Sequence, residues 1–265
     1  AEQAWEAAQD LGLPVVIKPT DGNHGRGVSL DLSTQADVQA ALSRQFDYPV
    51  LTAGDQGADP ELVAAFEPNS PRVEALRKLR SQLVLRRMTN PQLCSVAVVG
   101  AERGEGRSWL AANLAVLFSQ LGERTLLVDC DLRFPRQQSL FRLPPAGGLA
   151  ARLAERGEKG AIQPHPRFDQ LSVLQAGIVP PNPQELLARR AFGAQISVAR
   201  DTYDMTLVDT PADETGADAR LVAATCGSAI VVARRHASVH KRVAELSAGL
   251  RGAGVAVIGG VLLDF

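Results

Sequence analysis

The chain has 265 residues, which is enough for one large domain or two small ones. Hydrophobic residues make up 45% and charged residues 22%, as in ordinary globular proteins, and the net charge of -1 gives no reason to expect nucleic acid as a partner. Cys94, Cys130 and Cys226 have no paired metal spacing and favour a reduced, cytoplasmic protein. No apolar run approaches the length of about 18 residues that a membrane span needs. We therefore expect any membrane role to depend on a partner.

The beginning of the chain predicts a small unit and a linker. Residues 13–32 contain a strand, a glycine-rich turn and a second strand, which predicts a hairpin. Residues 34–46 have the spacing of an amphipathic helix. Residues 49–60 carry Pro, Gly and Asp with little periodicity. We expect a partial N-terminal segment over 1–43, a linker over 44–69 and the main domain over 70–265.

The main domain begins with a basic amphipathic helix over residues 70–88, with Ser70 as its cap and Pro71 in its first turn. Short apolar runs then alternate with helical patterns, which predicts an α/β fold with a mostly parallel sheet and helices on both faces. The predicted strands are 95–100, 125–130, 171–176, 205–210, 229–234 and 255–263. The predicted helices are 107–121, 183–189, 192–200, 217–225 and 238–252.

A glycine-rich loop joins the first of these strands to the first helix. Its residues, Ala101 to Ser108, follow the phosphate-loop pattern G-x-x-x-x-G-K-[ST], with Ala101 in place of the first Gly and Arg107 in place of Lys. Gly104 and Gly106 allow backbone N–H groups to turn toward phosphate oxygens, and the helix adds its positive end. The alternative is a glycine turn that caps a helix and binds nothing.

Acidic residues stand at the ends of two other predicted strands. Asp129 and Asp131 follow one strand, and Asp209 ends another. A single aspartate at such a place usually caps a helix or forms a turn. Ligands of parallel sheets bind beyond the carboxyl ends of the strands, where the loop also lies. Together the three features predict a nucleotide site with Mg²⁺.

The motifs AERGEGRS, LLVDCDLR and LVDTPA, in this order, resemble the bacterial tyrosine kinase family of polysaccharide export, and most closely its EpsG-type branch. The resemblance covers about residues 44 to 265 and implies a P-loop NTPase fold of the MinD/ParA-like class that binds ATP and Mg²⁺. It implies ATP contacts from Arg103, Gly104, Glu105, Gly106, Arg107, Ser108 and Trp109. It implies catalytic roles for Asp129, Asp131, Arg107 and Arg133. It implies Mg²⁺ ligation by Ser108, Asp129 and Asp131, with Asp209 placing the metal.

The same resemblance implies partners. Glu74, Arg77 and Arg80 match an E-x-x-R-x-x-R helix that joins neighbouring subunits in relatives, although a solvated helix face with internal ion pairs is the alternative from sequence alone. The other implied partner is a membrane chain-length determinant (Wzz-like) protein. We therefore expect a cytoplasmic protein, peripheral to the inner membrane through that partner.

Three features depart from the family pattern, the mildest being Ala212, where relatives often have a second Pro. Arg107 replaces the lysine, and although arginine is a variant of the EpsG-type branch, its planar fork fits phosphates differently from an ammonium group. Many relatives end in a tyrosine-rich tail, whereas this chain ends in GGVLLDF and contains two tyrosines, Tyr48 and Tyr203. We therefore expect any tyrosine substrate to be another protein.

Residues 1–43 resemble a different family, a segment of the ATP-grasp domain of cyanophycin synthetase. There Lys18 and the loop from Asp21 to Gly27 would meet a nucleotide, but the acidic metal ligands of such a domain have no counterpart here. An exposed hairpin without a ligand is the simpler interpretation.

Three functional hypotheses follow. The first is a protein-tyrosine-kinase-like regulator of exopolysaccharide chain length or export that binds Mg-ATP. The second is a non-catalytic nucleotide switch that assembles with the membrane chain-length determinant. The third is a fragment of the cyanophycin synthetase ligase, in which nucleotide binding would depend on Lys18 rather than Asp129.

Overall fold

The computed structural model describes residues 15–17, 29–32, 51–52, 55–154 and 161–264. The chain divides into two units, residues 1–49 and residues 50–265. In the first unit, β1 (Val15–Ile17) pairs antiparallel with β2 (Ser29–Leu32), which confirms the predicted hairpin. The helix predicted over 34–46, Lys18 and the turn from Asp21 to Gly27 lie outside the described residues.

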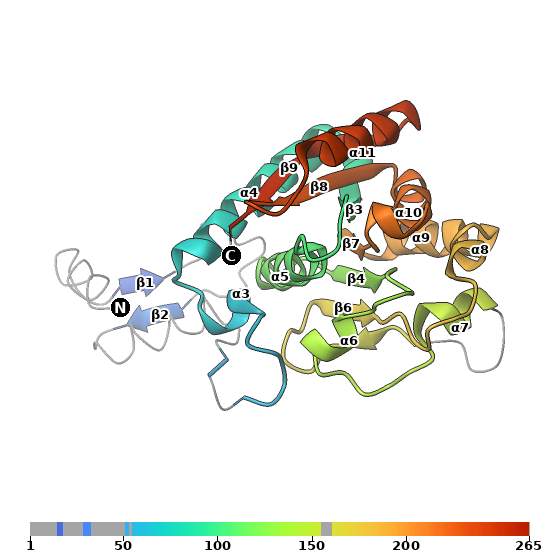
Figure 1. Ribbon diagram of the computed structural model, residues 1–265. Helices are drawn as coiled ribbons and strands as arrows, with labels where there is room; N and C mark the ends of the chain where they lie inside the picture. Colours follow the sequence, from blue (N-terminus) through green and yellow to red (C-terminus); the bar gives the residue numbers. More distant parts are fainter. Residues whose placement is uncertain (1–14, 18–28, 33–50, 53–54, 155–160, 265) are drawn as a thin grey trace. The chain divides into compact units, whose positions relative to one another are not determined.

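The second unit is built on a seven-stranded sheet with the order β5-β6-β4-β7-β3-β8-β9 (Figure 1). Neighbouring strands are parallel except for β5, which pairs antiparallel with β6. The mostly parallel sheet predicted from the sequence is therefore confirmed. The strands are β3 (Ser95–Gly100), β4 (Thr125–Asp129), β5 (Gln163–Pro164), β6 (Leu171–Leu174), β7 (Met205–Asp209), β8 (Ser228–Arg234) and β9 (Ala256–Leu263).

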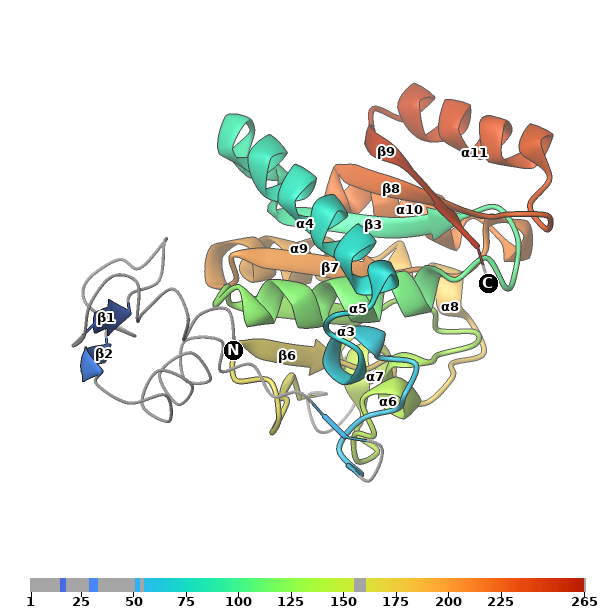
Figure 2. The same ribbon diagram turned by 90° about the vertical axis from the view of Figure 1, so that its left-hand side faces the viewer.

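Helices cover both faces of this sheet, and alternate strand residues belong to separate hydrophobic cores. In β3, Val96 and Val98 pack in one core, whereas Ala97 and Val99 pack in the other. The first core includes α3 (Val63–Phe66), α4 (Pro71–Thr89), α5 (Arg107–Gln120) and α6 (Gln137–Leu140), and Figure 2 looks onto α4 and α5. The second includes α7 (Gly148–Ala154), α8 (Pro183–Leu187), α9 (Arg190–Thr202), α10 (Asp218–Cys226) and α11 (His240–Gly252).

The strand register brings the predicted site together. In the parallel pair β4–β7, Asp129 lies opposite Asp209, and in the pair β7–β3, Asp209 lies opposite Val98. Two residues beyond Val98, β3 ends at Gly100 and the glycine-rich loop begins. Because the three strands are parallel, their carboxyl ends lie at one edge of the sheet. All three strands are buried over their whole length, so this edge has protein on both faces.

The segment predicted as a linker differs from that expectation in its described part. Residues 51–69 contain α3, and Leu51, Leu62 and Val63 are buried in the same core as α5. The amide of Asn113 on α5 joins the two: its Oδ1 accepts from the N–H of Ala64 at 2.9 Å. Propensity favours a flexible connection here, but burial of apolar side chains against α5 decides the structure. These residues form part of the P-loop unit.

Helix α4 follows the prediction closely. Ser70 Oγ accepts from the Val73 N–H at 3.3 Å, and Pro71 occupies the first turn. Its last turn is attached by Arg87 to the segments just before β4 and β7, because Arg87 donates to the carboxylate of Glu123 and to the Asp204 carbonyl. The short elements α6, α7 and β5 were not predicted, because runs of two to seven residues carry too little periodicity.

Asn113 provides a test of this packing. Its Nδ2 donates to the carbonyls of Glu61 and Trp109, at 3.1 and 2.9 Å, in addition to the bond from Ala64. We expect Asn113→Ala to lower the free energy of unfolding by about 2 kcal/mol, because buried backbone groups lose their partner. Urea unfolding measures this change. Asn182→Ala is the control, since the Asn182 side chain is exposed and makes no capping hydrogen bond. Equal effects of the two substitutions would contradict the assignment of residues 51–69 to the core.

Candidate nucleotide site

The glycine-rich loop has the conformation that its pattern predicts. Gly104 and Gly106 have φ of 77° and 91°, in the left-handed region that glycine adopts without strain, and α5 begins at Arg107 directly after them. The loop borders a pocket at the carboxyl edge of the sheet. The lining comprises Arg103, Gly104, Gly106, Arg107, Ser108, Trp109, Asp131, Phe134, Arg136, Ala212 and Thr215. Most of the predicted nucleotide contacts therefore share one concave surface.

Arg107 lies at the pocket but is held by the protein itself. Its side chain is buried, with a relative exposure of 7%. The Nε donates to the Thr210 carbonyl at 3.0 Å, and one terminal nitrogen donates to the Glu102 carbonyl at 2.6 Å. A lysine ammonium offers a single nitrogen and cannot occupy both positions. The guanidinium thus braces the loop against the end of β7 and keeps a positive charge beside the pocket.

Glu105 points behind the loop. It is only 1% exposed, and its Oε2 accepts from the Glu102 N–H at 3.0 Å and lies 3.9 Å from the Arg107 guanidinium. A side chain at Gly100 would clash with this pair, because an added Cβ would lie 2.5 Å from Glu105 Oε2 and 3.0 Å from Arg107. We therefore interpret Glu105, which was predicted to contact ATP, as a support for the loop and for Arg107.

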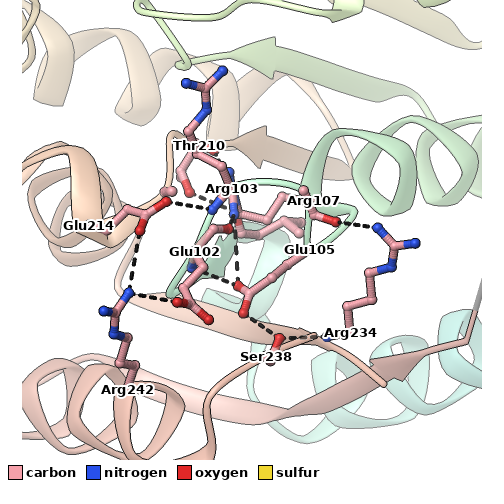
Figure 3. A network of polar contacts seen from close by, with 12 residues as sticks. Glu102, Arg103, Glu105, Arg107, Thr210, Glu214, Arg234, Ser238 and Arg242 are labelled. Atoms are coloured by element: carbon pink, nitrogen blue, oxygen red, sulfur yellow. Dashed lines mark hydrogen bonds and ion pairs between the residues drawn. The ribbon is translucent and has the colours of Figure 1, made fainter. Parts of the chain in front are cut away.

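The loop is also attached to the segment between β8 and α11 (Figure 3). The Ser238 hydroxyl donates to Glu105, and the Glu102 carboxylate accepts from the Val239 N–H at 3.1 Å and from Arg242 at 2.6 Å. On the other side, the Arg103 N–H donates to the Glu214 carboxylate at 2.9 Å. These contacts position the backbone of the loop from both neighbouring strand ends.

An exposed cation–π pair stands at the rim of the pocket. The guanidinium of Arg103 lies 3.8 Å from the centre of the Phe134 ring. Phe134 follows Asp129 and Asp131, which we call the acidic motif, and lies in the loop after β4, the acidic loop. It is 49% exposed, which is unusual for a large aromatic side chain. The side chain of the predicted loop residue Arg103 is thus directed toward the acidic loop.

The two aspartates of the acidic motif have different surroundings. Asp129 accepts from three backbone N–H groups, those of Asp131, Arg136 and Gln137, and so shapes the loop that follows β4. Asp131 accepts from the N–H groups of Arg133 and Phe134 and also lines the pocket. Of the pair, Asp131 is the carboxylate that faces the pocket.

Asp209 and Asp129 are fully buried next to each other, and the pKa of each carboxyl group is shifted as a result. Burial raises the pKa of Asp129 well above its usual range, and the charge of Asp209 raises it further. Burial also raises the pKa of Asp209 to about 6, against the hydrogen bond from Gln137, the nearby Ser108 side chain and the charge of Arg107. The site therefore concentrates negative charge that a cation would stabilise.

The donor set fits Mg²⁺ when the nucleotide supplies the remaining ligands. In the described part of the chain, no three Asp, Glu, His or Cys side chains gather as a metal-binding group. Mg²⁺ at phosphate sites usually takes one or two protein oxygens, and phosphates and water complete its shell. Ser108 and Asp131 line the pocket, and Asp209 has a buried oxygen, Oδ1, with no hydrogen-bond partner among the described residues. These oxygens are suited to that role.

Arg133, predicted as catalytic, makes its main contact away from the loop. Its Nε donates to Asp218 at 2.7 Å, and this ion pair raises the pKa of Arg133. Gly216, with φ of 150°, leaves space for the pair, since an added Cβ would lie 3.3 Å from the guanidinium. The pair connects the acidic loop to the start of α10. Sequence reasoning missed Asp218, because no motif links it to Arg133.

The predicted self-association residues lie on α4. Glu74 and Arg77 form an ion pair at 3.6 Å on the outer side of the helix, and Leu85 and Met88 are exposed further along. Arg80 instead donates to the Leu117 carbonyl of α5 at 3.1 Å. Arg80 thus contributes to holding α4 on its own subunit. Within the described residues, no helix combines the length and apolar character needed to cross a bilayer.

Comparison with known proteins identifies the family. No family model matches the chain. The sequence is 31% identical over 196 residues to the putative tyrosine-protein kinase CapB of Staphylococcus aureus, which covers 74% of this chain and 86% of CapB. This chain belongs to the bacterial tyrosine-protein kinase family. It is also 33% identical over 183 residues to the tyrosine-protein kinase Wzc of Salmonella typhi, covering 69% of this chain and 25% of Wzc, so it spans about a quarter of that longer relative.

Solved structures agree with the family and the fold. The kinase domain of the Escherichia coli tyrosine kinase ETK superposes with a TM-score of 0.72 at 30% identity, covering 79% of this chain and 82% of that domain. The cell division ATPase MinD of Pyrococcus furiosus superposes with a TM-score of 0.56 at 27% identity, covering 64% of this chain and 71% of MinD. The predicted MinD-like P-loop fold is confirmed. The tyrosine kinase resemblance is also confirmed, whereas the ATP-grasp resemblance of residues 1–43 stays a prediction.

The raised pKa of Asp209 predicts that the stability of this domain depends on pH. Folding raises the pKa of Asp209 from 3.8 to about 6. Between about pH 4 and 6, Asp209 is therefore more often protonated in the folded than in the unfolded chain. Because of this difference, the contribution of Asp209 to the free energy of unfolding decreases as the pH rises through this range. We expect Asp209→Asn to reduce this decrease and to be more stable than wild type at neutral pH. Urea unfolding at a series of pH values tests it. Asp204→Asn is the control, and its pH dependence should have the opposite sign. The hydrogen bond from Arg124 lowers the pKa of Asp204, so the contribution of Asp204 to stability is lost as the pH falls. Parallel pH curves for wild type and Asp209→Asn would contradict the prediction.

The bracing role of Arg107 makes a second prediction. We expect Arg107→Lys, which restores the common loop sequence, to lower the free energy of unfolding by about 1–2 kcal/mol, because one of two buried carbonyls loses its donor. Denaturant unfolding measures the change. Arg124→Lys is the control, because Arg124 is in an exposed ion pair with Asp204, and there we expect little change in stability. A domain with Arg107→Lys that is as stable as wild type would rule out the brace.

Proposed function

We propose that this chain binds ATP with Mg²⁺ and transfers phosphate to tyrosine residues of another protein. The observation that carries the proposal is the common edge formed by the glycine-rich loop, the Asp129–Asp131 loop and Asp209. Membership of the tyrosine-protein kinase family supports the choice of tyrosine as acceptor. Tyr203 packs against the second core, which disfavours it as the acceptor, and we propose an acceptor tyrosine on another protein.

In this proposal each residue has a defined task. The N–H groups of the loop and the charge of Arg107 hold the β and γ phosphates. Ser108 and the acidic residues hold Mg²⁺, which supplies charge stabilisation at the phosphates. Asp131 accepts the proton of the incoming tyrosine hydroxyl, because it is the acidic-motif carboxylate that lines the pocket. Arg133 keeps the Asp131 loop in place through Asp218.

The biological setting follows from the family. We propose that the domain regulates exopolysaccharide chain length or export, that it works beside a membrane chain-length determinant protein, and that this partner brings it to the inner membrane. Copies of the chain would associate through α4, where Glu74 and Arg77 lie on the outer side and Leu85 and Met88 expose apolar surface.

A nucleotide switch without phosphate transfer is the second candidate. Two observations favour it: Arg107 is already bonded to Thr210 and Glu102, and the loop is attached to the segment before α11. Nucleotide binding at such a loop could change the position of α11 and the assembly state without any chemistry.

Binding and transfer can be tested on the full chain. Calorimetric titration with ATP, with and without Mg²⁺, should show Mg²⁺-dependent binding, and radiolabelled ATP should label a glutamate–tyrosine copolymer. At saturating Mg²⁺ we expect Asp131→Asn still to bind ATP but to reduce labelling at least about 100-fold, because an amide cannot accept the proton. Asp169→Asn, at an exposed position, is the matched control.

The outcomes separate the two candidates. Binding without labelling, together with nucleotide-dependent assembly in sedimentation experiments, would establish the switch and exclude the kinase. Absence of ATP binding would overturn both candidates.

A further inference from the structure

Gln137 connects the three parts of the candidate site. It is fully buried, and its backbone N–H donates to Asp129 Oδ2 at 2.9 Å. Its side-chain Nε2 donates to Asp209 Oδ2 at 2.7 Å and to the Ser108 carbonyl at 3.2 Å. One residue therefore contacts the acidic loop, the end of β7 and the first turn of α5. The motifs that predicted these parts do not include it.

The hydrogen bonds of Gln137 determine how its amide is oriented. The amide nitrogen carries two hydrogens, and both face oxygens that can only accept, so the nitrogen and the oxygen cannot be exchanged. The side-chain oxygen Oε1 must then lie on the other side. In the described residues, Gln137 Oε1 and Asp209 Oδ1 are both buried without a hydrogen-bond partner. The two oxygens without a partner thus belong to side chains that are hydrogen-bonded to each other, Gln137 and Asp209.

The chemistry of these atoms defines what is missing. Both oxygens only accept hydrogen bonds, so the absent group must supply hydrogens or positive charge. A buried apolar group or a second acceptor would not satisfy them. Mg²⁺ keeps several of its water molecules when it binds beside phosphates, and each such water has hydrogens to donate. Oxygens that accept from metal-bound groups hold the metal in place from the second layer of contacts.

We propose that Gln137 is a positioning residue of the Mg²⁺–ATP site, and that its Oε1 accepts a hydrogen bond from a water molecule on the metal. Its Nε2 meanwhile holds Asp209 and the first turn of α5 in register with the acidic loop. This inference rests on the proposed function, because it requires that Mg²⁺ binds with the nucleotide.

Two substitutions separate the role of the oxygen from that of the nitrogen. Gln137→Leu keeps the approximate size of the side chain and removes both polar atoms. Gln137→Glu removes the donor and keeps an acceptor oxygen. Gln138→Leu is the matched control, since the neighbouring glutamine is only partly buried and donates to the Leu143 carbonyl at the long distance of 3.5 Å.

The experiment is a series of calorimetric ATP titrations at increasing Mg²⁺ concentration, on the full chain. For Gln137→Leu we expect the Mg²⁺ concentration at half-maximal ATP binding to rise about tenfold, as for other residues behind metal ligands. For Gln137→Glu and Gln138→Leu we expect it to stay within about twofold of wild type or, for Gln137→Glu, to fall. Thermal unfolding of each variant without ligands, and ATP affinity without Mg²⁺, report on folding and on the loop.

Each outcome decides the question. If both Gln137 variants weaken ATP binding equally with and without Mg²⁺, the residue acts only through its Nε2 and the proposal is overturned. An unchanged Mg²⁺ requirement in Gln137→Leu also overturns it, while Mg²⁺-dependent binding by wild type leaves the proposed function standing. If wild type binds no ATP, the proposed function and the role of Gln137 fail together.

Discussion

The parallel pairing of β4 with β7 is the constraint on which the rest of the site depends. Its register places Asp129 beside Asp209 at a strand end that is covered on both faces. Burial strips both carboxylates of their hydration and raises both pKa values, and the charge of Asp209 raises the pKa of Asp129 further. The surrounding structure compensates with donors: three backbone N–H groups on Asp129 and the amide of Gln137 on Asp209.

That compensation is incomplete in a way that suits a nucleotide site. Asp209 keeps a buried oxygen without a partner among the described residues, and Asp131 remains at the pocket. Arg107, whose positive charge acts on Asp209, is held by two backbone carbonyls. A cation bound with phosphate would neutralise the carboxylates, and the loop N–H groups would balance the phosphate charge. The raised pKa values of the two buried aspartates and the shape of the loop thus point to the same class of ligand.

Arg107 is packed together with its neighbours in this chain and does not stand as an isolated feature of the loop. Arg107 is larger than lysine, and Gly100 beneath it leaves room for the guanidinium and for Glu105. Glu105 in turn bonds to Ser238 ahead of α11. Arginine at this position is therefore integrated in the packing. This is why we expect a return to lysine to destabilise the domain.

Much of the fold and of the site could be predicted from the sequence. Short apolar runs predict buried parallel strands, because a strand covered on both faces has no polar side, and the six predicted strands are present. Gly104 and Gly106 predict the shape of the loop, because their left-handed backbone is strained for other residues. The strand-end aspartates predict a common edge, because parallel strands run in one direction and therefore end at the same edge of the sheet. These features depend on local sequence and on general rules of sheet geometry.

Tertiary structure decided what depends on contacts between distant segments. Leu51, Leu62 and α3 lie in a segment predicted as a linker, yet they pack with α5 because Asn113 and the apolar core offer them partners. Glu105, Arg133 and Arg80 lie within recognisable motifs, but their directions are set by Ser238, Asp218 and the Leu117 carbonyl, far away in the chain. Gln137 has no motif at all, and its place between Ser108, Asp129 and Asp209 exists only once three strand ends meet. The sequence by itself therefore determined which chemistry lies at this edge, whereas the packing decided which side chain reaches it, since side-chain direction depends on partners that local patterns do not encode.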